Sequence, residues 1–376
     1  MSRIRQPAWT ASVLLSLVAA VTLVAGCGPS NPPAPTPSGP IVVPSLSSGT
    51  TPTAVPPTAA PTNAVASIVL ISAVGESGAG TPSQLAWQGV QDAAGRLGTK
   101  SALVVPVSMA ALTAAVDSAV AGGAGVVVSV GPEAAQAVLG AAAGHAATQF
   151  FELGETIAAG APPNVHGLVF DDAEAGYLAG FVAGSFTAQG TIGMVGVSGT
   201  DAATANYASG YRNGAAEANA AVQVRVAYAN RANDTATGRA VAGGLVKAGA
   251  DVVLAMAGFT GAGAMRQACA LKAGVVALDT DASLVFPDVR PCLIVTVLDR
   301  YDVAAREAIL RYVAGDALPA TVMFDVAGGG VALSDFGKPM PAGFAERLAG
   351  VLAALRNGPP RPTAAPSPTA APTPTA

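Results

Sequence analysis

A short apolar stretch that ends in carboxylates is the first place in this sequence where ligand chemistry could occur. Residues 275–278 are apolar and rich in β-branched side chains, and Asp279, Thr280 and Asp281 follow directly. An apolar run of this length predicts a buried strand. Ligands of open α/β sheets bind outside the carboxyl ends of strands, where loops converge. We therefore predict a ligand pocket here, with Asp279 as its main anchor and Asp281 beside it.

A glycine-rich turn lies one predicted helix before this strand. Residues 258–263 read G-x-x-G-x-G between a predicted strand and a predicted helix, and Asp279 follows about 20 residues later. A dinucleotide-binding unit has this spacing but the order G-x-G-x-x-G, so the pattern does not support a dehydrogenase. Free backbone N–H groups at the helix start could instead donate to a ligand oxygen. A tight turn that needs glycine for packing is the alternative.

The sequence supports no catalytic or metal site. The chain has two histidines, His145 and His166, and they form no metal-binding spacing with cysteine. Residues 196–200 miss the G-x-S-x-G nucleophile motif at its last position. Two pairs of neighbouring carboxylates could serve a glycosidase, but such pairs are more often helix caps or hydroxyl acceptors: Asp171 with Asp172, and Asp279 with Asp281. We predict a protein that is not an enzyme and needs no cofactor.

The elements that position these residues alternate between strand and helix. The first series has strands at 67–74, 102–107, 125–130, 149–153 and 165–170, with helices beginning near Pro82, 110 and 133. The second has strands at 191–197, 222–228, 251–256 and 275–278, with helices at 175–186, 202–218, 235–248 and 261–272, and a further strand at 293–298 and helix at 301–313 follow it. A hairpin is predicted around Gly328 and Gly329, between strands at 321–326 and 330–333, before a last helix at 342–355. This alternation predicts right-handed βαβ units and parallel sheets.

Two such series predict a bilobed α/β fold, with two parallel-sheet lobes and a ligand cleft between them. We place the chain crossings near Asp171 and Asp281. Asp171 also resembles a helix N-cap, because Glu174 follows three residues later. Residues 64–170 plus about 282–356 would form lobe 1, and residues 171–281 would form lobe 2.

The amino terminus predicts export. Arg3 and Arg5 precede an apolar run at 11–26, and this is the layout of a signal peptide. Residues 23–27 (LVAGC) resemble a bacterial lipobox, and this resemblance implies cleavage after residue 26 and lipidation of Cys27. An uncleaved amino-terminal anchor is the alternative. Both place the body of the protein on the extracytoplasmic face of the cell membrane.

Composition indicates the nature of the remaining segments and excludes some classes of partner. Residues 28–63 and 359–376 are rich in Pro, Ser, Thr and Ala, so we predict a linker and a disordered tail. The net charge of −4, without a basic patch, argues against nucleic acid as a partner. Cys269 and Cys292 could form a disulfide in an exported protein, and two buried free thiols are the alternative.

Several motifs together resemble the basic membrane protein family. Residues 170–180 (FDDAEAGYLAG) resemble its F-x-x-x-E-x-x-Y-L-A-G signature. Further similar segments are 86–89 (AWQG), 193–196 (GMVG), 207–214 (YASGYRNG), 249–253 (GADVV), 261–263 (GAG) and 277–281 (ALDTD). The resemblance implies the type I periplasmic-binding-protein fold. It also implies a lipoprotein that serves as the substrate-binding subunit of an ABC transporter for purine nucleosides.

The resemblance assigns roles to individual residues. Asp279 matches the carboxylate that accepts hydrogen bonds from ribose hydroxyls, and a strand-end cap is its alternative role. Trp87 matches an aromatic residue beside the pocket, with core packing as the alternative. Gly258 matches the point where the backbone approaches the sugar. We expect the loop at 76–84, with Ser83 and Gln84, to line the opposite lobe.

Four positions depart from the family pattern. The two phenylalanines that would stack on the base correspond to Pro82 and, approximately, Ala232. The aspartate that would recognise the base corresponds to Gly154, between Glu152 and Glu155, and the lysine that would touch the ribose corresponds to Asp299. Each stacking contact contributes about 1–3 kcal/mol per base in nucleic-acid complexes. Trp87, Phe259 or Tyr228 could supply stacking instead.

We therefore expect a monomeric solute-binding lipoprotein that delivers a small polar ligand, such as a purine nucleoside, to an ABC permease. The alternative function is a membrane-anchored sensor, or a surface enzyme acting on glycosides or nucleosides, built on the same scaffold. The sequence contains no feature that distinguishes transport from sensing.

Overall fold

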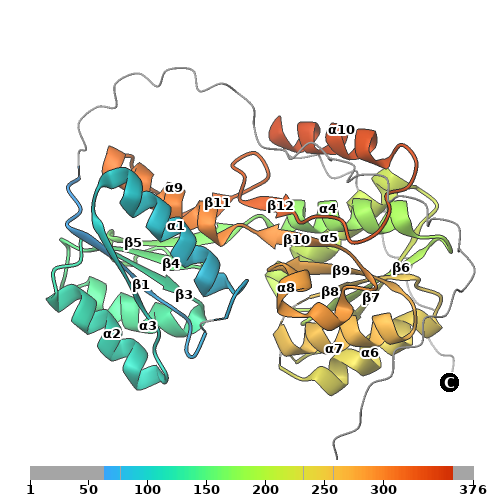
Figure 1. Ribbon diagram of the computed structural model, residues 1–376, viewed down its shortest axis with the longest axis horizontal. Helices are drawn as coiled ribbons and strands as arrows, with labels where there is room; N and C mark the ends of the chain where they lie inside the picture. The colour runs from blue at the N-terminus through green and yellow to red at the C-terminus, as the bar shows by residue number, and fades with distance from the viewer. Residues whose placement is uncertain (1–62, 77, 232, 257, 359–376) are drawn as a thin grey trace, which may run out of the picture. The chain divides into compact units, whose positions relative to one another are not determined.

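The computed structural model describes residues 63–358, apart from residues 77, 232 and 257 (Figure 1). By its internal contacts the chain divides into units at 1–56 and 57–376, and all described residues belong to the second unit. The predicted signal peptide, Cys27, most of the predicted linker and the predicted carboxyl-terminal tail lie outside the described residues. Within the described part of the chain, no helix has the length and apolar character needed to cross a bilayer.

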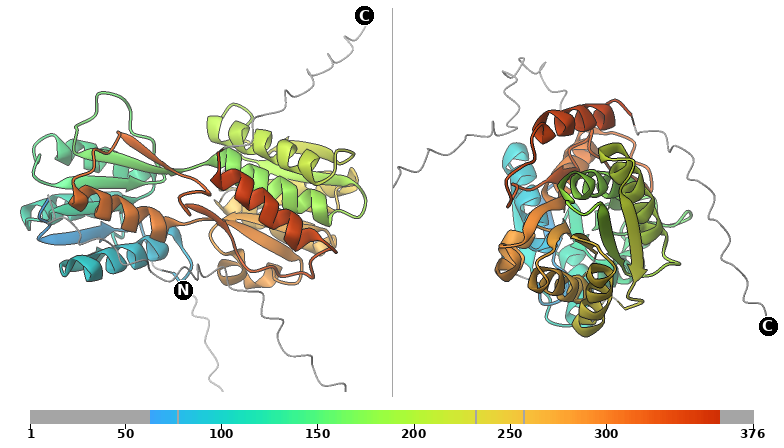
Figure 2. Two further views of the ribbon diagram at one scale, coloured as in Figure 1. Left: turned by 90° about the horizontal axis from the view of Figure 1, so that it is seen from above. Right: turned by 90° about the vertical axis from the view of Figure 1, so that its right-hand side faces the viewer.

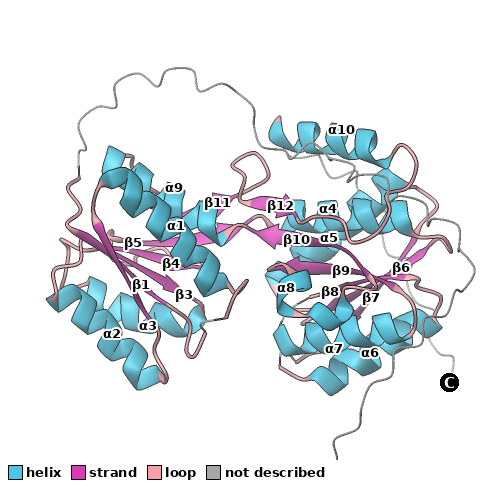
Figure 3. Ribbon diagram, viewed as in Figure 1, coloured by secondary structure: helices cyan, strands magenta, loops and turns pink. Residues whose placement is uncertain are grey.

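The first lobe is built on a six-stranded parallel sheet with the order β11-β5-β4-β3-β1-β2. Its strands are β1 (Ser67–Ile71), β2 (Lys100–Val104), β3 (Val126–Val130), β4 (Gln149–Leu153), β5 (Val165–Phe170) and β11 (Thr321–Phe324). Helices α1 (Pro82–Leu97) and α9 (Tyr301–Ala314) pack together over one face, and α2 (Met109–Ala121) and α3 (Pro132–Ala142) cover the other (Figure 3). The predicted alternation of strand and helix is confirmed.

The second lobe repeats this plan with the strand order β12-β10-β9-β8-β6-β7. Its strands are β6 (Thr191–Gly196), β7 (Gln223–Tyr228), β8 (Val252–Ala255), β9 (Gly274–Asp279), β10 (Leu293–Asp299) and β12 (Val331–Leu333), and β12 alone runs antiparallel to its neighbour. Its helices are α4 (Asp172–Phe186), α5 (Ala202–Ala218), α6 (Thr235–Lys247), α7 (Gly258–Ala270), α8 (Ala282–Val285) and α10 (Phe344–Arg356), with a 3-10 turn η1 (Pro287–Val289). The views in Figure 2 show α4, α5 and α10 grouped together.

The chain passes between the two sheets after β5, after β10 and after β11. These crossing segments hydrogen-bond to one another: the Asp171 N–H donates to the Phe324 carbonyl at 2.9 Å, and the Arg300 N–H donates to the Gly330 carbonyl at 2.8 Å. The Phe170 ring also contacts the Tyr301 ring edge to face, with 4.9 Å between centroids. The three crossing segments are therefore held to one another by hydrogen bonds and a ring contact, and are not independent linkers.

The predicted boundary between the lobes needs correction. Residues 282–299 were assigned to lobe 1, but β10 pairs with β9 and belongs to the second sheet. The second crossing accordingly comes after Asp299, and Asp281 instead caps α8 by accepting the Ser283 N–H at 2.8 Å. The last helix, α10, also packs on the second lobe, with the Phe344 ring stacked on Phe181 of α4. An apolar strand matches either sheet equally well, so its periodicity does not reveal its partner.

The predicted hairpin around Gly328 and Gly329 is also wrong. Strand β11 joins the first sheet and β12 joins the second, so the two strands do not pair with each other. The chain leaves β11 along the second lobe because the Val326 N–H donates to the buried Glu174 carboxylate at 2.8 Å. Sequence reasoning assigned Glu174 to a capping box, whereas the structure uses it to hold a crossing segment.

Glycine lets α4 and α5 approach each other closely. A Cβ atom at Gly180 would lie 2.0 Å from the Tyr211 carbonyl oxygen, and a Cβ atom at Gly214 would lie 1.9 Å from the Tyr177 carbonyl oxygen. Such distances are far below van der Waals contact, so the helices can pack this way only without side chains at these points. The abundance of glycine in the sequence therefore has a packing role in this pair.

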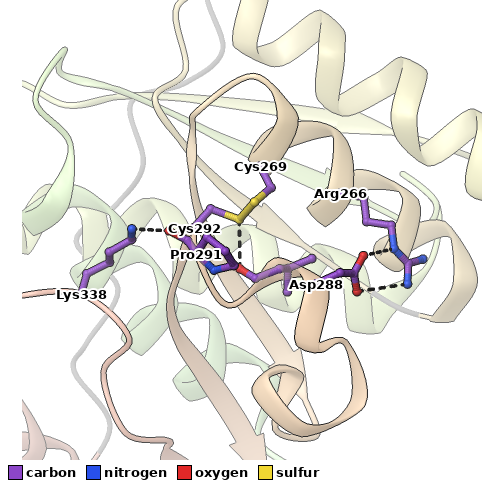
Figure 4. Close-up of a disulfide and its surroundings, with 7 residues drawn as sticks. Arg266, Cys269, Asp288, Pro291, Cys292 and Lys338 are labelled. Carbon is purple, nitrogen blue, oxygen red and sulfur yellow. Dashed lines mark hydrogen bonds and ion pairs between the residues drawn. A yellow bond between two sulfur atoms is a disulfide. The ribbon is translucent and has the colours of Figure 1, made fainter. Parts of the chain in front are cut away.

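A disulfide between Cys269 and Cys292 staples α7 to the start of β10, with 5.4 Å between the Cα atoms (Figure 4). The closed loop contains β9, α8 and η1, and therefore Asp279. The same segment is held by an ion pair between Arg266 and Asp288, with 2.6 Å between Nε and Oδ2. The structure thus resolves the choice between a disulfide and two free thiols that the sequence left open.

Replacing Gly214 with alanine should destabilise the protein by about 1–3 kcal/mol, because the helices must separate to admit the methyl group. Gly140→Ala is the matched control: it is also helical, its Cβ would have no neighbour within 4 Å, and the change should stabilise α3 by about 0.5–1 kcal/mol. Urea unfolding of both variants measures the difference. Equal free energies of unfolding for the two variants would contradict the packing argument.

Removing the disulfide with the double change Cys269→Ala and Cys292→Ala should lower the free energy of unfolding by about 3 kcal/mol. The reason is that the open segment, which spans a sequence separation of 23 residues, gains freedom when unfolded. Chemical unfolding of the wild type with and without reductant gives the matching comparison. Thiol labelling of both cysteines in the unreduced, denatured wild type would refute the bridge.

Candidate functional site

The site is built around Asp279, the last residue of β9. Its backbone has a φ of +78°, in the left-handed region that L-residues other than Asn and Asp seldom occupy. The carboxylate accepts a hydrogen bond from the Tyr301 hydroxyl. Its Oδ1 atom is buried and has no hydrogen-bond partner among the described residues. The position therefore combines a strained backbone with an acceptor that the protein leaves unused.

A second partly buried carboxylate, Asp299, ends the neighbouring strand. Strands β9 and β10 run parallel with Asp279 opposite Leu298, so Asp299 follows by one residue. The Asp299 Oδ1 atom is also buried without a partner among the described residues. Burial raises the pKa of Asp279 to about 6, with a smaller contribution from the Glu76 carboxylate. Burial and the nearby charges of Asp279 and Asp172 raise the pKa of Asp299 well above its ordinary value.

The groups around this pair are acidic or neutral. Burial, with the Asp171 and Asp201 charges, raises the pKa of Asp172 to about 6. Tyr207 of α5 is buried near the same carboxylates, and burial followed by the Asp299 charge raises its pKa well above the ordinary value. Tyr301 is buried as well, and its pKa is raised first by burial and then by the Asp279 charge.

The nearest cation is engaged elsewhere. Arg300 follows Asp299 directly, but its guanidinium donates to both carboxylate oxygens of Asp302, at 2.8 and 2.7 Å. No ion pair within the described part of the chain includes Asp279 or Asp299. The described residues also contain no group of three or more His, Cys, Asp or Glu side chains arranged to hold a metal ion.

The first-lobe residues singled out in the sequence mainly shape a loop. Ser83 is buried, donates its hydroxyl to Glu76 and accepts the Ala73 N–H at 3.1 Å. Gln84 accepts the Gly80 N–H at 3.2 Å through Oε1. These bonds hold the loop that carries Glu76, whose charge acts on Asp279. A direct role for Ser83 or Gln84 in ligand contact stays a prediction.

The aromatic residues that could stack on a ligand differ in how exposed they are. Trp87 on α1 is half-buried and packs against the hydrophobic core, as its alternative role required. Phe259 is 66% exposed at the start of α7, beside Gly258, which has a φ of +55°. Tyr228 is 37% exposed at the end of β7. Ala232, the position that corresponds to the second stacking residue, lies outside the described residues.

The structure adds residues that sequence reasoning missed. Tyr301, Tyr207 and Asp172 contact or influence the carboxylate pair, and Asp299 was noted only as a departure from the family pattern. The available signal was position: Asp299 and Tyr301 flank the carboxyl end of an apolar strand, where ligands of α/β sheets bind. Asp281, in contrast, was predicted as a ligand contact but its carboxylate is occupied as the cap of α8.

A third buried carboxyl group lies in the first lobe. Glu152 on β4 is fully buried, accepts a hydrogen bond from the Ser129 hydroxyl and has an Oε1 atom without a partner among the described residues. Burial raises the pKa of Glu152 to about 8, with smaller contributions from Glu155 and Glu133. Glu152 is therefore mainly protonated at neutral pH and belongs to the structure of the sheet end.

The raised pKa of Glu152 makes stability depend on pH. The folded state holds this proton to about pH 8, whereas the unfolded chain releases it near the ordinary value of 4.5, so stability falls as pH rises between these values. Glu152→Gln should remove this decline and stabilise the protein by up to about 4 kcal/mol at pH 8. Thermal unfolding from pH 5 to 8 measures this pH dependence of stability. The control is Glu346→Gln, at an exposed position. An unchanged pH profile in Glu152→Gln would contradict the assignment.

Known proteins of similar structure confirm the fold. A transcriptional activator of the comK gene from Bacillus halodurans superposes with a TM-score of 0.65 at 16% identity, covering 78% of this chain and 98% of that one. An ABC transporter solute-binding protein from Conexibacter woesei gives 0.60 at 22% identity, covering 78% and 96%. At these identities the similarity shows a shared fold of two α/β lobes.

Sequence relatives point to one family. Basic membrane protein B of Borrelia garinii subsp. bavariensis is 32% identical over 128 residues, which cover 34% of this chain and 37% of that protein. The ABC transporter nucleoside-binding protein BmpA of Lactococcus lactis subsp. cremoris is 33% identical over 126 residues, covering 31% and 36%. The chain thus spans less than two fifths of the length of these relatives.

A family model matches a much longer part of the chain. It describes PnrA-like ABC transporter substrate-binding proteins, named Bmp, and it covers residues 75–342. This range includes every strand of the two sheets except β1, and it includes the residues Asp279 and Asp299 at the centre of the candidate site. Because the match extends over more than half of the sequence, the chain belongs to the Bmp family of PnrA-like ABC transporter substrate-binding proteins.

Proposed function

We propose that this protein binds a nucleoside-like solute through Asp279 and delivers it to the permease of an ABC importer. The observation that carries the proposal is the buried, unpartnered Oδ1 atom of Asp279 at the carboxyl end of β9. A buried acceptor without a partner costs free energy, and ligand hydroxyl groups can supply the missing hydrogen bonds. Membership of a family of substrate-binding proteins supports a ligand as the missing partner.

The arrangement of Asp279 suits a sugar. The Tyr301 hydroxyl already donates to this carboxylate, so the free Oδ1 and the remaining lone pairs are left for ligand hydroxyls. Hydrogen bonds to an ionised carboxylate are roughly twice as strong as bonds between neutral groups. The name of the Lactococcus relative, a nucleoside-binding protein, is consistent with a ribose at this position.

The part of the site that would hold a base has few aromatic side chains available for stacking. Pro82, at the start of α1, has no aromatic ring to stack on a base. The Trp87 ring packs against the core and does not offer a free face. Phe259 is exposed at the start of α7 and is the available candidate for stacking. We therefore assign the sugar end to Asp279 and Gly258, and the base end to Phe259.

Export and anchoring complete the proposal. The lipobox-like sequence before Cys27 would attach the protein to the extracytoplasmic face of the membrane, and residues 28–63 would act as a tether. A monomer on such a tether can reach a permease in the same membrane. Mass spectrometry of the mature protein tests this part: an unmodified Cys27 with residues 1–26 still attached would contradict lipidation.

The proposed ligand contact predicts a specific loss. Adenosine, inosine, guanosine and ribose are added to the full chain, and a ligand at 100 times its dissociation constant should stabilise the protein by about 2.7 kcal/mol. Asp279→Ala should abolish this thermal shift because the hydroxyl acceptor is gone. Asp281→Ala is the matched control, since its carboxylate caps α8, and it should retain the shift. Unchanged affinity in Asp279→Ala would remove this residue from the site.

A further inference from the structure

The carboxylate pair at the ends of β9 and β10 lacks a counter-charge. Asp279 and Asp299 each have a buried oxygen without a partner among the described residues. Only one protein donor, the Tyr301 hydroxyl, serves either carboxylate in the contacts that the structure shows. Like charges in a poorly solvated place repel each other strongly unless a cation or a proton lies between them. The raised pKa values of Asp279 and Asp299 show that the pair retains a proton more readily than ordinary carboxyls, and a cationic ligand group could take the place of that proton at the free oxygens.

The protein does not supply that group. The Arg300 guanidinium forms two hydrogen bonds with Asp302, at 2.8 and 2.7 Å. It therefore does not neutralise Asp279 or Asp299. The surrounding charged side chains add negative charge: Glu76 acts on Asp279, and Asp172 acts on Asp299. The site as a whole thus attracts cations and disfavours anions such as phosphate esters.

A bound metal ion is a poor match for this arrangement. Calcium takes six to eight oxygen ligands, and magnesium requires near-octahedral coordination. The described residues contain no cluster of three or more side chains arranged for a metal. A protonated primary amine needs only acceptors, because it offers three N–H donors and no acceptor. Two carboxylate oxygens and a neighbouring hydroxyl satisfy such an amine.

We propose that the solute bound here carries a protonated amine next to its hydroxyl groups, with the amine between Asp279 and Asp299. This inference rests on the proposed function, since it places the ligand at Asp279, and it narrows the ligand class to amino sugars or amino-nucleosides. Asp279 accepts hydroxyl and amine donors, and Asp299 selects the charged ligand. A neutral nucleoside would leave the Asp299 acceptor and the repulsion between the carboxylates uncompensated.

Matched ligand pairs test the inference directly. Calorimetry of the full chain at about pH 7 compares 3′-amino-3′-deoxyadenosine with adenosine, and glucosamine with glucose. The amine should bind at least tenfold more tightly than its neutral partner in at least one pair, because it forms a charge-assisted bond. Equal or weaker binding of the amine in both pairs overturns the inference.

Two substitutions separate a charge effect from loss of structure. Asp299→Asn keeps the shape but removes the charge, so it should reduce affinity for the amine at least tenfold and leave adenosine within about threefold. Ser334→Ala, on the neighbouring strand end, is not suitable as a control because its hydroxyl accepts the Thr296 N–H. Exposed Asp335→Asn is the control, and it should change neither affinity. Loss of adenosine and amine binding to the same extent in Asp299→Asn would refute charge selection.

The pH dependence gives a second, independent measurement. Burial and mutual repulsion hold protons on the pair at low pH, and an ammonium ligand must displace them. Affinity for the amine should therefore rise from about pH 5 to pH 7 and binding should release protons, whereas adenosine should respond less. The facing groups are Glu76 from the first-lobe loop, Asp171 as the N-cap of α4, Asp172 from α4, Tyr207 from α5, Tyr301 from α9 and the paired Arg300 and Asp302. Identical pH profiles for the two ligands contradict the inference.

The outcomes distinguish this inference from the function on which it rests. Adenosine binding that depends on Asp279 but shows no preference for an amine retains the proposed function and rejects the amine. Failure of all four probes to bind rejects both. Stabilisation by Ca²⁺ alone that disappears in Asp299→Asn rejects the amine in favour of a metal ion.

Discussion

The partial burial of two carboxylates at the ends of β9 and β10, each with one oxygen shielded from water, is the constraint on which the candidate site depends. Ionised groups are stable in a protein interior only when hydrogen bonds or opposite charges replace their lost solvation. Here the protein provides the Tyr301 hydroxyl and leaves the Oδ1 atoms of Asp279 and Asp299 without a described partner. The free protein therefore carries an electrostatic cost that a complementary ligand would relieve. The disulfide around β9 and the close packing of α4 against α5 stabilise the lobe that bears this cost.

Tyr301 connects the ligand anchor to the chain crossings. Its hydroxyl donates to Asp279, while its ring contacts Phe170 at the end of β5. The crossing segments are further joined by backbone bonds, and Glu174 holds the third crossing through the Val326 N–H. A ligand that changes the charge or position of Asp279 thus acts on a residue that also belongs to the connection between the sheets. One side chain thus joins the candidate anchor to the connection between the sheets.

Local sequence patterns predicted most of the strands and helices. They did not predict which strands pair with each other or which cysteines form a bond. The alternation of apolar strands and amphipathic helices predicted both parallel sheets, and the carboxylates after residue 278 pointed to Asp279, whose role as ligand anchor stays a prediction. The partner of β10 was misassigned because an apolar strand is compatible with either sheet, and the Gly328–Gly329 turn looked like a hairpin although its flanking strands enter different sheets. The pairing of Cys269 with Cys292 required the fold, since spacing alone does not bring two cysteines together. Tyr301 was missed because its residue type at a helix start has no distinctive pattern, and only its position after an apolar strand pointed to the site.

The departures from the family pattern acquire a common meaning once Asp299 is seen next to Asp279. The resemblance implied a lysine at position 299, and an aspartate there reverses the sign of the charge beside the anchor. In the same chain Pro82 stands where a stacking aromatic residue was expected, and Trp87 is taken up by core packing. Loss of stacking weakens the hold on a flat base, and the reversed charge strengthens the hold on a cation. Under the proposed function, both changes would favour a charged, hydroxylated ligand over a flat aromatic one, while the fold and Asp279 stay as the family pattern implies.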